Sequence, residues 1–281
     1  SECLVGSEMC IRDRYVATAA ACGATDDDST AYSVGYVSGR EAAAVGCNWD
    51  FGPVCDLLYN WRNTIVNTRA YGKDPELVIK NAKAYVRGVR ESGLAVCCKH
   101  FPGDGIEELD QHLVMGVNTM ECDEWDSTFG HVYKEMIDSG IQSIMAGHIA
   151  LPEYSRKLRP GIKDEDIMPA TLAPELITDL LRGKLGFNGL VLTDASHMAG
   201  MTAAMPRSQQ VPGAIAAGCD MFLFFNDIEE DFGYMMDGYR NGIITEERLT
   251  DALRRILGLK ASLKLHEKMK KGTLIPVSYT H

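Results

Sequence analysis

The alternation of helical patterns with short apolar strands limits this chain to few folds. Each strand begins shortly after a glycine, the residue that commonly ends a helix in a left-handed conformation. Alternating helices and near-continuous apolar strands predict a parallel sheet covered by helices, which is an α/β fold. The predicted strands are 47–54, 94–98, 141–146, 190–193 and 221–225, after Gly46, Gly93, Gly140, Gly189 and Gly218. The predicted helices are 29–45, 74–92, 121–139, 173–185 and 245–257.

Polar residues follow the strands at the ends where parallel α/β folds carry their chemistry. In a barrel these ends converge on one mouth, whereas in an open sheet they spread along an edge. No glycine-rich phosphate loop follows a strand, so a nucleotide-binding sheet is the weaker interpretation. The residues at these ends are Asp56, Lys99, His100, His148, Asp194 and Asn226.

The composition excludes several classes of protein. The 281 residues carry a formal net charge of -11, which argues against nucleic acid or an anionic membrane as a partner. With 46% hydrophobic residues the chain can bury a full core, and no apolar run approaches the ~20 residues that span a bilayer. Seven cysteines lie beyond residue 14, without a C-x-x-C motif, which indicates structural thiols and a cytoplasmic location.

The two ends of the chain show signs of a cloning artefact. One back-translation of residues 277–281 has a reverse complement that encodes Met9 to Asp13, and the DNA it implies resembles a sequencing adapter. We therefore expect residues 1–14 and 277–281 to be artefactual. Residues 15–271 would form the folded part, followed by a tail at 272–281, and natural sequence would be missing at both ends.

Two segments combine chemistry-bearing residues. Lys99 and His100 end a strand and open a glycine- and acid-rich loop that reaches Asp110 and His112. Burying such a cluster is costly unless it binds something polar, although a solvated loop is the simpler alternative for any single residue. Asp194 directly follows an apolar strand, where it is either a helix N-cap or a site residue.

These segments together resemble the N-terminal catalytic domain of glycoside hydrolase family 3, and most closely its bacterial β-N-acetylglucosaminidase branch. The likeness covers nearly all of residues 15–271. The matching segments are, in order, 69–75 (RAYGKDP), 99–105 (KHFPGDG), 110–112 (DQH), 147–148 (GH) and 193–194 (TD).

The resemblance implies a retaining glycosidase that releases terminal β-linked N-acetylhexosamine from a small carbohydrate substrate, without a metal or cofactor. Asp194 would be the nucleophile and His112 the acid/base, with Asp110 orienting its imidazole. Further ligands of the sugar hydroxyls would be Lys99, His100 and Arg69. His148 either lines the site or is a core histidine.

The resemblance also implies an incomplete TIM-type (β/α)8 barrel. The family barrel has eight strands, and the five seen here align with the last five, so we expect the first three strands, with a sugar-binding aspartate, to be missing. Two unpaired sheet edges would then favour aggregation. A further C-terminal domain is also expected to be lost. In the catalytic loop, Asp104 and Gln111 stand where the branch commonly has His and Ser, which leaves the substrate open.

Three alternatives remain open. The chain could be a β-glucosidase or β-xylosidase of the same family whose acid/base lies in a lost domain. It could be a metal-dependent barrel hydrolase, with His100, His112, His148 and Asp194 as ligands, although these lack the tight spacing of a metal motif. It could be a non-catalytic sugar-binding barrel. Asp50 and Asp56 are either mouth or turn residues, and His131, His197 and His266 receive no role.

Overall fold

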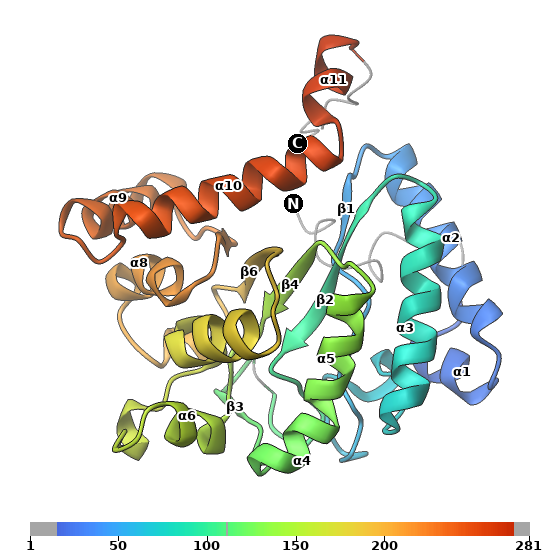
Figure 1. The fold of residues 1–281 in the computed structure, drawn as a ribbon, viewed down its shortest axis with the longest axis horizontal. Helices are drawn as coiled ribbons and strands as arrows, with labels where there is room; N and C mark the ends of the chain where they lie inside the picture. The colour runs from blue at the N-terminus through green and yellow to red at the C-terminus, as the bar shows by residue number, and fades with distance from the viewer. Residues whose placement is uncertain (1–15, 111, 273–281) are drawn as a thin grey trace.

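A five-stranded parallel sheet forms the centre of the fold (Figure 1). The computed structural model describes residues 16–110 and 112–272. The strands lie side by side in chain order, so each neighbour along the sequence is also the neighbour in space. All five predicted strands are present: β1 (Trp49–Asp50), β2 (Ala95–Phe101), β4 (Ser143–Ala146), β6 (Leu190–Ala195) and β7 (Met221–Leu223). The chain is therefore an α/β protein whose sheet forms a half-barrel.

Both faces of this sheet are buried, which explains the continuous apolar strands. Successive residues of a strand point to opposite faces, so Val96 and Cys98 pack under the helices while Cys97 faces the inner side. The inner face continues with Met145, Leu190 and Leu192, and part of it is covered by Ile256 and Leu259 of α10 (Glu246–Ser262). Helices thus enclose the sheet on the outside, and α10 covers part of its inside.

The helices that alternate with these strands agree in part with the sequence. The predicted helix 121–139 is divided at Thr128 into two helices, and the helices α8 (Arg207–Ala217) and α9 (Ile228–Arg240) were not predicted. Pro212 inside α8 hides the helical pattern, whereas Asp227 before α9 is a recognisable N-cap that accepts from the N–H groups of Glu229 and Glu230. The main helices are α1 (Ala19–Ala24), α2 (Asp28–Ala44), α3 (Pro75–Arg90), α4 (Cys122–Ser127), α5 (Phe129–Asp138), α6 (Pro152–Leu158), η5 (Glu175–Lys184), α7 (Ala199–Thr202), α8 (Arg207–Ala217), α9 (Ile228–Arg240), α10 and α11 (Leu265–Lys270).

Short elements complete the fold between these helices and strands. They are the two-stranded sheet of β3 (Gly116–Val117) and β5 (Ile149–Ala150), and the short helices η2 (Asn67–Arg69), η3 (Asp164–Asp166) and η4 (Ala170–Leu172).

The glycines before the strands have two different roles. Gly46, Gly93, Gly140 and Gly218 have positive φ angles, as predicted for the turn that ends a helix. Before β6 this conformation belongs instead to Gly186, with φ 78°. Gly189 is needed for space, because a Cβ there would lie 2.6 Å from the carbonyl oxygen of Gln142.

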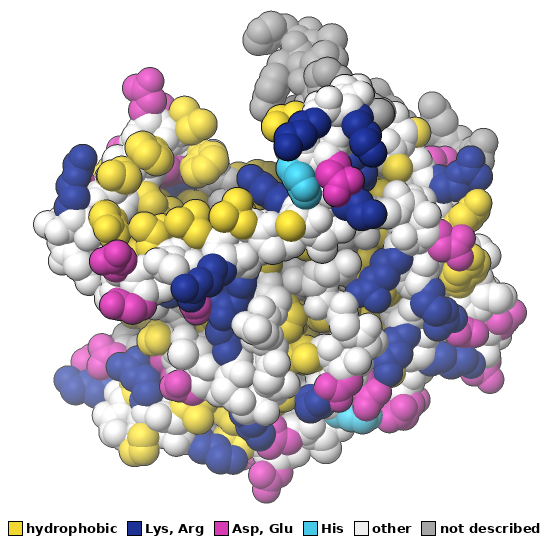
Figure 2. All heavy atoms as spheres, turned by 45° about the horizontal axis from the view of Figure 1, so that its top comes forward, with side chains coloured by type: hydrophobic (Ala, Val, Ile, Leu, Met, Phe, Trp, Pro, Cys, Tyr) yellow, Lys and Arg dark blue, Asp and Glu magenta, His cyan; other side chains and the backbone are white. Residues whose placement is uncertain are grey.

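Large apolar side chains remain exposed on α9 and α10. Ile228, Phe232, Leu253 and Leu257 are 47–66% exposed, and Figure 2 shows hydrophobic side chains gathered over this part of the surface. In the described part of the chain β1 and β7 are the edges of the main sheet. Aggregation through such edges and faces stays a prediction.

No helix within residues 16–110 and 112–272 has the length and apolarity needed to cross a membrane.

Candidate active site

Five residues singled out from the sequence line one pocket at the carboxyl end of the sheet. They are Arg69, Lys99, His100, His112 and Asp194. The cavity has a volume of about 130 Å³. Its other lining residues are Phe51, Ile65, Met145, Ala195, His197, Met198, Leu223 and Phe224. Because parallel strands end at the same edge, residues far apart in sequence meet in this pocket.

Asp194 is the carboxylate of this pocket. It lies within β6, and its Oδ1 accepts the N–H of Ala195 at 2.7 Å. It is not a helix N-cap, since α7 begins at Ala199 with Met198 at its N-cap. Burial by itself would raise the pKa of Asp194, but His100, the Ala195 N–H and Lys99 outweigh it, so the pKa lies below its usual value. Asp194 is therefore ionised at neutral pH.

His100 lies between Asp194 and a second, deeper carboxylate, Asp56. Its Nδ1 donates to Asp56 Oδ2 at 2.8 Å, and its Nε2 lies 3.9 Å from Asp194 Oδ2. Asp56 is fully buried, and its Oδ1 also accepts the N–H groups of His100 at 3.2 Å and Asp104 at 2.8 Å. Burial opposes ionisation of Asp56, but His100 and these donors bring its pKa below the usual value. Asp56 thus fixes the ring of His100 with Nε2 toward Asp194.

Two further cations face the same cavity. Lys99 is only 7% exposed, and burial, followed by the neighbouring Arg69, lowers its pKa, while Asp194 opposes that shift. Arg69 donates from Nη1 to the carbonyl oxygen of Ile65 at 3.4 Å. Both side chains can donate hydrogen bonds to sugar hydroxyls beside Asp194.

The loop between β2 and β3 brings His112 to the pocket. His112 Nδ1 and Asp110 Oδ1 are 2.7 Å apart, and the same oxygen accepts the backbone N–H of His112 at 2.7 Å. The N–H of Ala199 donates to the carbonyl oxygen of His112 at 3.0 Å, which attaches this loop beside the end of β6. The His112 side chain is 52% exposed, so its ring can reach a bound substrate. Gln111 lies outside the described residues.

His148 is placed differently from the other predicted site residues. It is fully buried and does not line the pocket. Its Nε2 lies 2.9 Å from the carbonyl oxygen of Ala195, and its Nδ1 lies 2.9 Å from Thr171 Oγ1. Burial lowers the pKa of His148, which favours the neutral ring, and Nε2 donates to the carbonyl oxygen of Ala195. Both nitrogens are thus engaged within the protein, which favours the core-histidine alternative over contact with a sugar.

The same contacts bear on the metal-dependent alternative. With both ring nitrogens of His148 engaged, only three of the four suggested ligands face the cavity. Among the described residues, no three His, Cys, Asp or Glu side chains are grouped closely enough to hold a metal ion.

Several pocket residues were not predicted. His197 is exposed at the mouth, and its ring stacks on Phe224 with centroids 6.2 Å apart and an interplanar angle of 24°. Phe51 lines the pocket beside β1. Phe51 and Phe224 directly follow β1 and β7, and His197 comes two residues after β6 ends. A search for residues at the carboxyl ends of the strands, which located Asp194, could therefore also have found these three.

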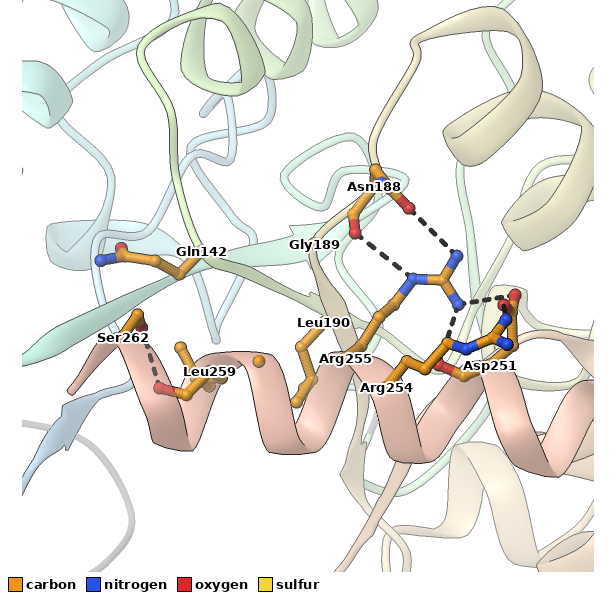
Figure 3. Close-up of a pocket in the computed structure, with 10 residues that line it drawn as sticks. Gln142, Asn188, Gly189, Leu190, Asp251, Arg254, Arg255, Leu259 and Ser262 are labelled. Atoms are coloured by element: carbon orange, nitrogen blue, oxygen red, sulfur yellow. Dashed lines mark hydrogen bonds and ion pairs between the residues drawn. The ribbon is translucent and has the colours of Figure 1, made fainter. Parts of the chain in front are cut away.

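A larger cavity of about 470 Å³ lies where β4 and β6 begin, at the opposite end of these strands from Asp194 (Figure 3). Arg255 of α10 donates to the backbone and side-chain oxygens of Asn188 at 3.3 and 3.2 Å, and to Asp251 Oδ2 at 2.9 Å. These polar groups pair with one another and join α10 to the segment before β6. This cavity is therefore a structural junction rather than the candidate site.

A sequence profile of the Glycosyl hydrolase family 3 N terminal domain matches residues 2–259. The chain belongs to glycosyl hydrolase family 3. A β-N-acetylglucosaminidase/β-glucosidase from Cellulomonas fimi is 52% identical over 272 residues, which cover 97% of this chain and 46% of that protein. Residues 1–14 and 277–281 lie outside the described residues, so the expectation that they are artefactual stays a prediction.

Solved structures of the family show the same arrangement of elements. One, described as the β-glucoside phosphorylase BglX bound to 2FGlc, has a TM-score of 0.91 and 45% identity, over 94% of this chain and 47% of its own. A family 3 β-N-acetylglucosaminidase from Paenibacillus sp. str. FPU-7 has a TM-score of 0.81 and 29% identity, over 89% of this chain and 46% of its own. The chain thus spans about half the length of these relatives.

Proposed function

We propose that this chain carries the catalytic site of a retaining glycosidase that removes terminal β-linked N-acetylhexosamine. The observation that carries the proposal is an ionised carboxylate, Asp194, lining the same pocket as His112, whose imidazole is paired with Asp110. The five parallel strands would be the last five of a TIM-type (β/α)8 barrel, because they follow one another in chain order with the site at their carboxyl ends.

The geometry supports a double displacement. Asp194 attacks the anomeric carbon, and the bond to the glycosidic oxygen breaks as His112 donates a proton to that oxygen. In the second step His112 takes a proton from water, the water oxygen bonds to the anomeric carbon, and Asp194 is released. Asp110 holds the His112 ring and stabilises its cation.

Other residues orient the sugar and the nucleophile. Lys99, His100 and Arg69 bind the sugar hydroxyls around Asp194. His148 acts as a positioning residue, because its bond to the carbonyl oxygen of Ala195 holds the backbone directly after the nucleophile.

The substrate is tested with two aryl glycosides on the 281-residue chain. We expect kcat/KM to be higher for aryl β-N-acetylglucosaminide than for aryl β-glucoside by about tenfold or more, the range that one additional recognised group provides. The Cellulomonas fimi relative carries both activities in its name, so both substrates belong in the assay. Equal rates, or a preference for the glucoside, would overturn the N-acetylhexosamine assignment. If the chain turned over neither substrate, the proposed activity would be refuted.

A second candidate is phosphorolysis, in which phosphate replaces water in the second step. It is favoured by the likeness to a chain described as a β-glucoside phosphorylase and by the charge of the pocket. Asp194 is the one acidic side chain among the described lining residues, and Arg69 and Lys99 face it together with three histidines. Arg69 and Lys99 can bind an anion beside Asp194, and an imidazole acid/base repels phosphate less than a second carboxylate would.

Phosphorolysis predicts a glycosyl phosphate as product. The chain is incubated with an aryl glycoside and inorganic phosphate, and products are separated by ion-exchange chromatography. We expect the release of phenol to rise by about tenfold or more with phosphate if breakdown of the glycosyl-enzyme limits turnover. Sulfate at equal ionic strength is the control. Free sugar as the sole product would leave hydrolysis as the reaction.

A further inference from the structure

Asn63 is a buried amide whose hydrogen-bonding capacity is fully used. It lies in the segment between β1 and η2 and has no exposed surface. Its Nδ2 donates to Asp104 Oδ1 at 2.9 Å and to the carbonyl oxygen of Glu107 at 2.8 Å. Its Oδ1 accepts the N–H groups of Ile65 at 3.1 Å and Val66 at 2.7 Å. A buried network satisfied in this way holds its members in one geometry.

The two bonds from Nδ2 cross to the loop after β2, and the two bonds to Oδ1 hold Asn63's own segment, so the side chain joins two segments that both lead to the pocket. Ile65 lines the pocket itself, and Val66 precedes η2, which ends at Arg69. Asp104 and Glu107 begin the loop that carries the dyad of Asp110 and His112. The Asn63 side chain is therefore a buried point of contact between the segment that leads to Arg69 and the loop that carries His112.

The base of the acid/base loop is closed by further contacts. Asn118 Nδ2 donates to the carbonyl oxygen of Gly103 at 3.0 Å, and the N–H of Val117 donates to the Glu107 carboxylate. The N–H of Asn60 donates to the carbonyl oxygen of Gly105 at 2.8 Å, and a Cβ at Gly105 would lie 2.1 Å from the carbonyl oxygen of Leu57. The two ends of the loop thus form one unit, which packs directly against the segment that contains Asn63.

The exposed contact between the same segments is weak by comparison. Arg62 Nη1 and Glu108 Oε1 are 3.2 Å apart, but their side chains are 60% and 54% exposed. Ion pairs this exposed contribute little to stability, because water and salt screen them. The buried amide is the stronger link.

We propose that Asn63 is a positioning residue that sets the placement of His112 relative to the sugar held by Arg69. The inference rests on the proposed role of His112 as acid/base. Proton transfer to the leaving oxygen depends on placement within about 1 Å, so loosening the base of the loop impairs acid catalysis before it impairs binding.

Asn63→Asp tests this inference with little change of shape. The variant keeps the acceptor for Ile65 and Val66 but replaces the two donors with a carboxylate that faces Asp104 and the carbonyl oxygen of Glu107. The matched control is Asn60→Asp, in the same segment. The Asn60 Oδ1 accepts the N–H of Arg62 at 3.0 Å, and a carboxylate preserves that bond.

Hydrogen exchange measured by mass spectrometry reports the loop directly and needs no turnover. We expect peptides covering 104–118 to exchange about tenfold or more faster in Asn63→Asp, because a buried hydrogen-bond partner is lost. Peptides of β6 in this variant should exchange at the wild-type rate. The 104–118 peptides of Asn60→Asp should also exchange at the wild-type rate. Unchanged exchange in this loop would overturn the inference whatever the activity. If Asn63→Asp does not fold, the double variant Asn63→Asp/Asp104→Asn places an amide donor at 104 opposite the carboxylate at 63. Failure of this double variant to recover folding would also overturn the inference.

Kinetics with two leaving groups separates positioning from a general structural role. A phenyl glycoside needs a proton on its leaving oxygen, whereas a dinitrophenyl glycoside does not. We expect Asn63→Asp to lower kcat/KM by about 100-fold for the phenyl glycoside and by less than about threefold for the dinitrophenyl glycoside. Equal losses for both would contradict the positioning role. His112→Ala should show the same split, and its absence there would instead refute the proposed acid/base.

Discussion

Asp194→Asn is expected to lower kcat for an aryl glycoside by about 10⁴-fold or more, the scale seen when a catalytic nucleophile is removed. The amide has nearly the same shape as the carboxylate, but it cannot form a stable bond to the anomeric carbon. The low pKa of Asp194 means that the wild-type carboxylate is already ionised at neutral pH, so the substitution removes the reactive form itself. Steady-state kinetics of phenol release measures the effect.

A folding control distinguishes this effect from misfolding. Asp237→Asn makes the same chemical change at a side chain on α9 that is 65% exposed, and should leave kcat unchanged. Both variants should unfold near the wild-type temperature. A 2-deoxy-2-fluoro glycoside with an activated leaving group should label Asp194, detected by mass spectrometry of the digested protein. Retention of more than about a tenth of the activity in Asp194→Asn would rule out its assignment as nucleophile.

Asp56→Ala is expected to lower the free energy of unfolding by about 3–5 kcal/mol, the cost of removing one partner of a buried ion pair. Without the carboxylate, His100 Nδ1 and the N–H of Asp104 lose their acceptor in a site closed to water. The ring of His100 would also lose its fixed orientation toward Asp194. Urea unfolding followed by circular dichroism measures the change.

The pH dependence of this effect has a definite sign. The folded-state pKa of Asp56 is lowered, so its ionised form stabilises the fold above the pKa of the unfolded state, about 3.9. This contribution is lost as pH falls from about 5 through the folded-state pKa. Asp104, whose pKa is raised by burial and by Asp56, opposes part of the trend. The stability difference between wild type and Asp56→Ala should therefore shrink in acid.

An exposed ion pair provides the control. Arg87 Nη2 and Asp28 Oδ2 are 3.1 Å apart, but their side chains are 59% and 36% exposed. Asp28→Ala should cost less than about 1 kcal/mol. If Asp56→Ala were no more destabilising than Asp28→Ala, the buried pair would not hold this part of the site together.

The local signals in the sequence account for the strands and for most of the pocket. Apolar runs after glycines located all five strands of the main sheet, and the residues at their ends included Lys99, His100 and Asp194. Helices were less predictable, because Pro212 breaks the pattern of α8 and Thr128 divides α4 from α5. His197 was missed although it follows β6 by only two residues.

The sequence by itself determined the alternating elements, the parallel sheet and the chemical groups at its carboxyl end, because strand patterns and motifs are local properties of the chain. Only the tertiary structure decided how those groups are used. It places Asp56 against His100 across 44 residues of chain, and Asn63 against Asp104 across 41. It also turns both nitrogens of His148 into the core. Such contacts depend on strand register and loop packing, which no single segment of the chain encodes.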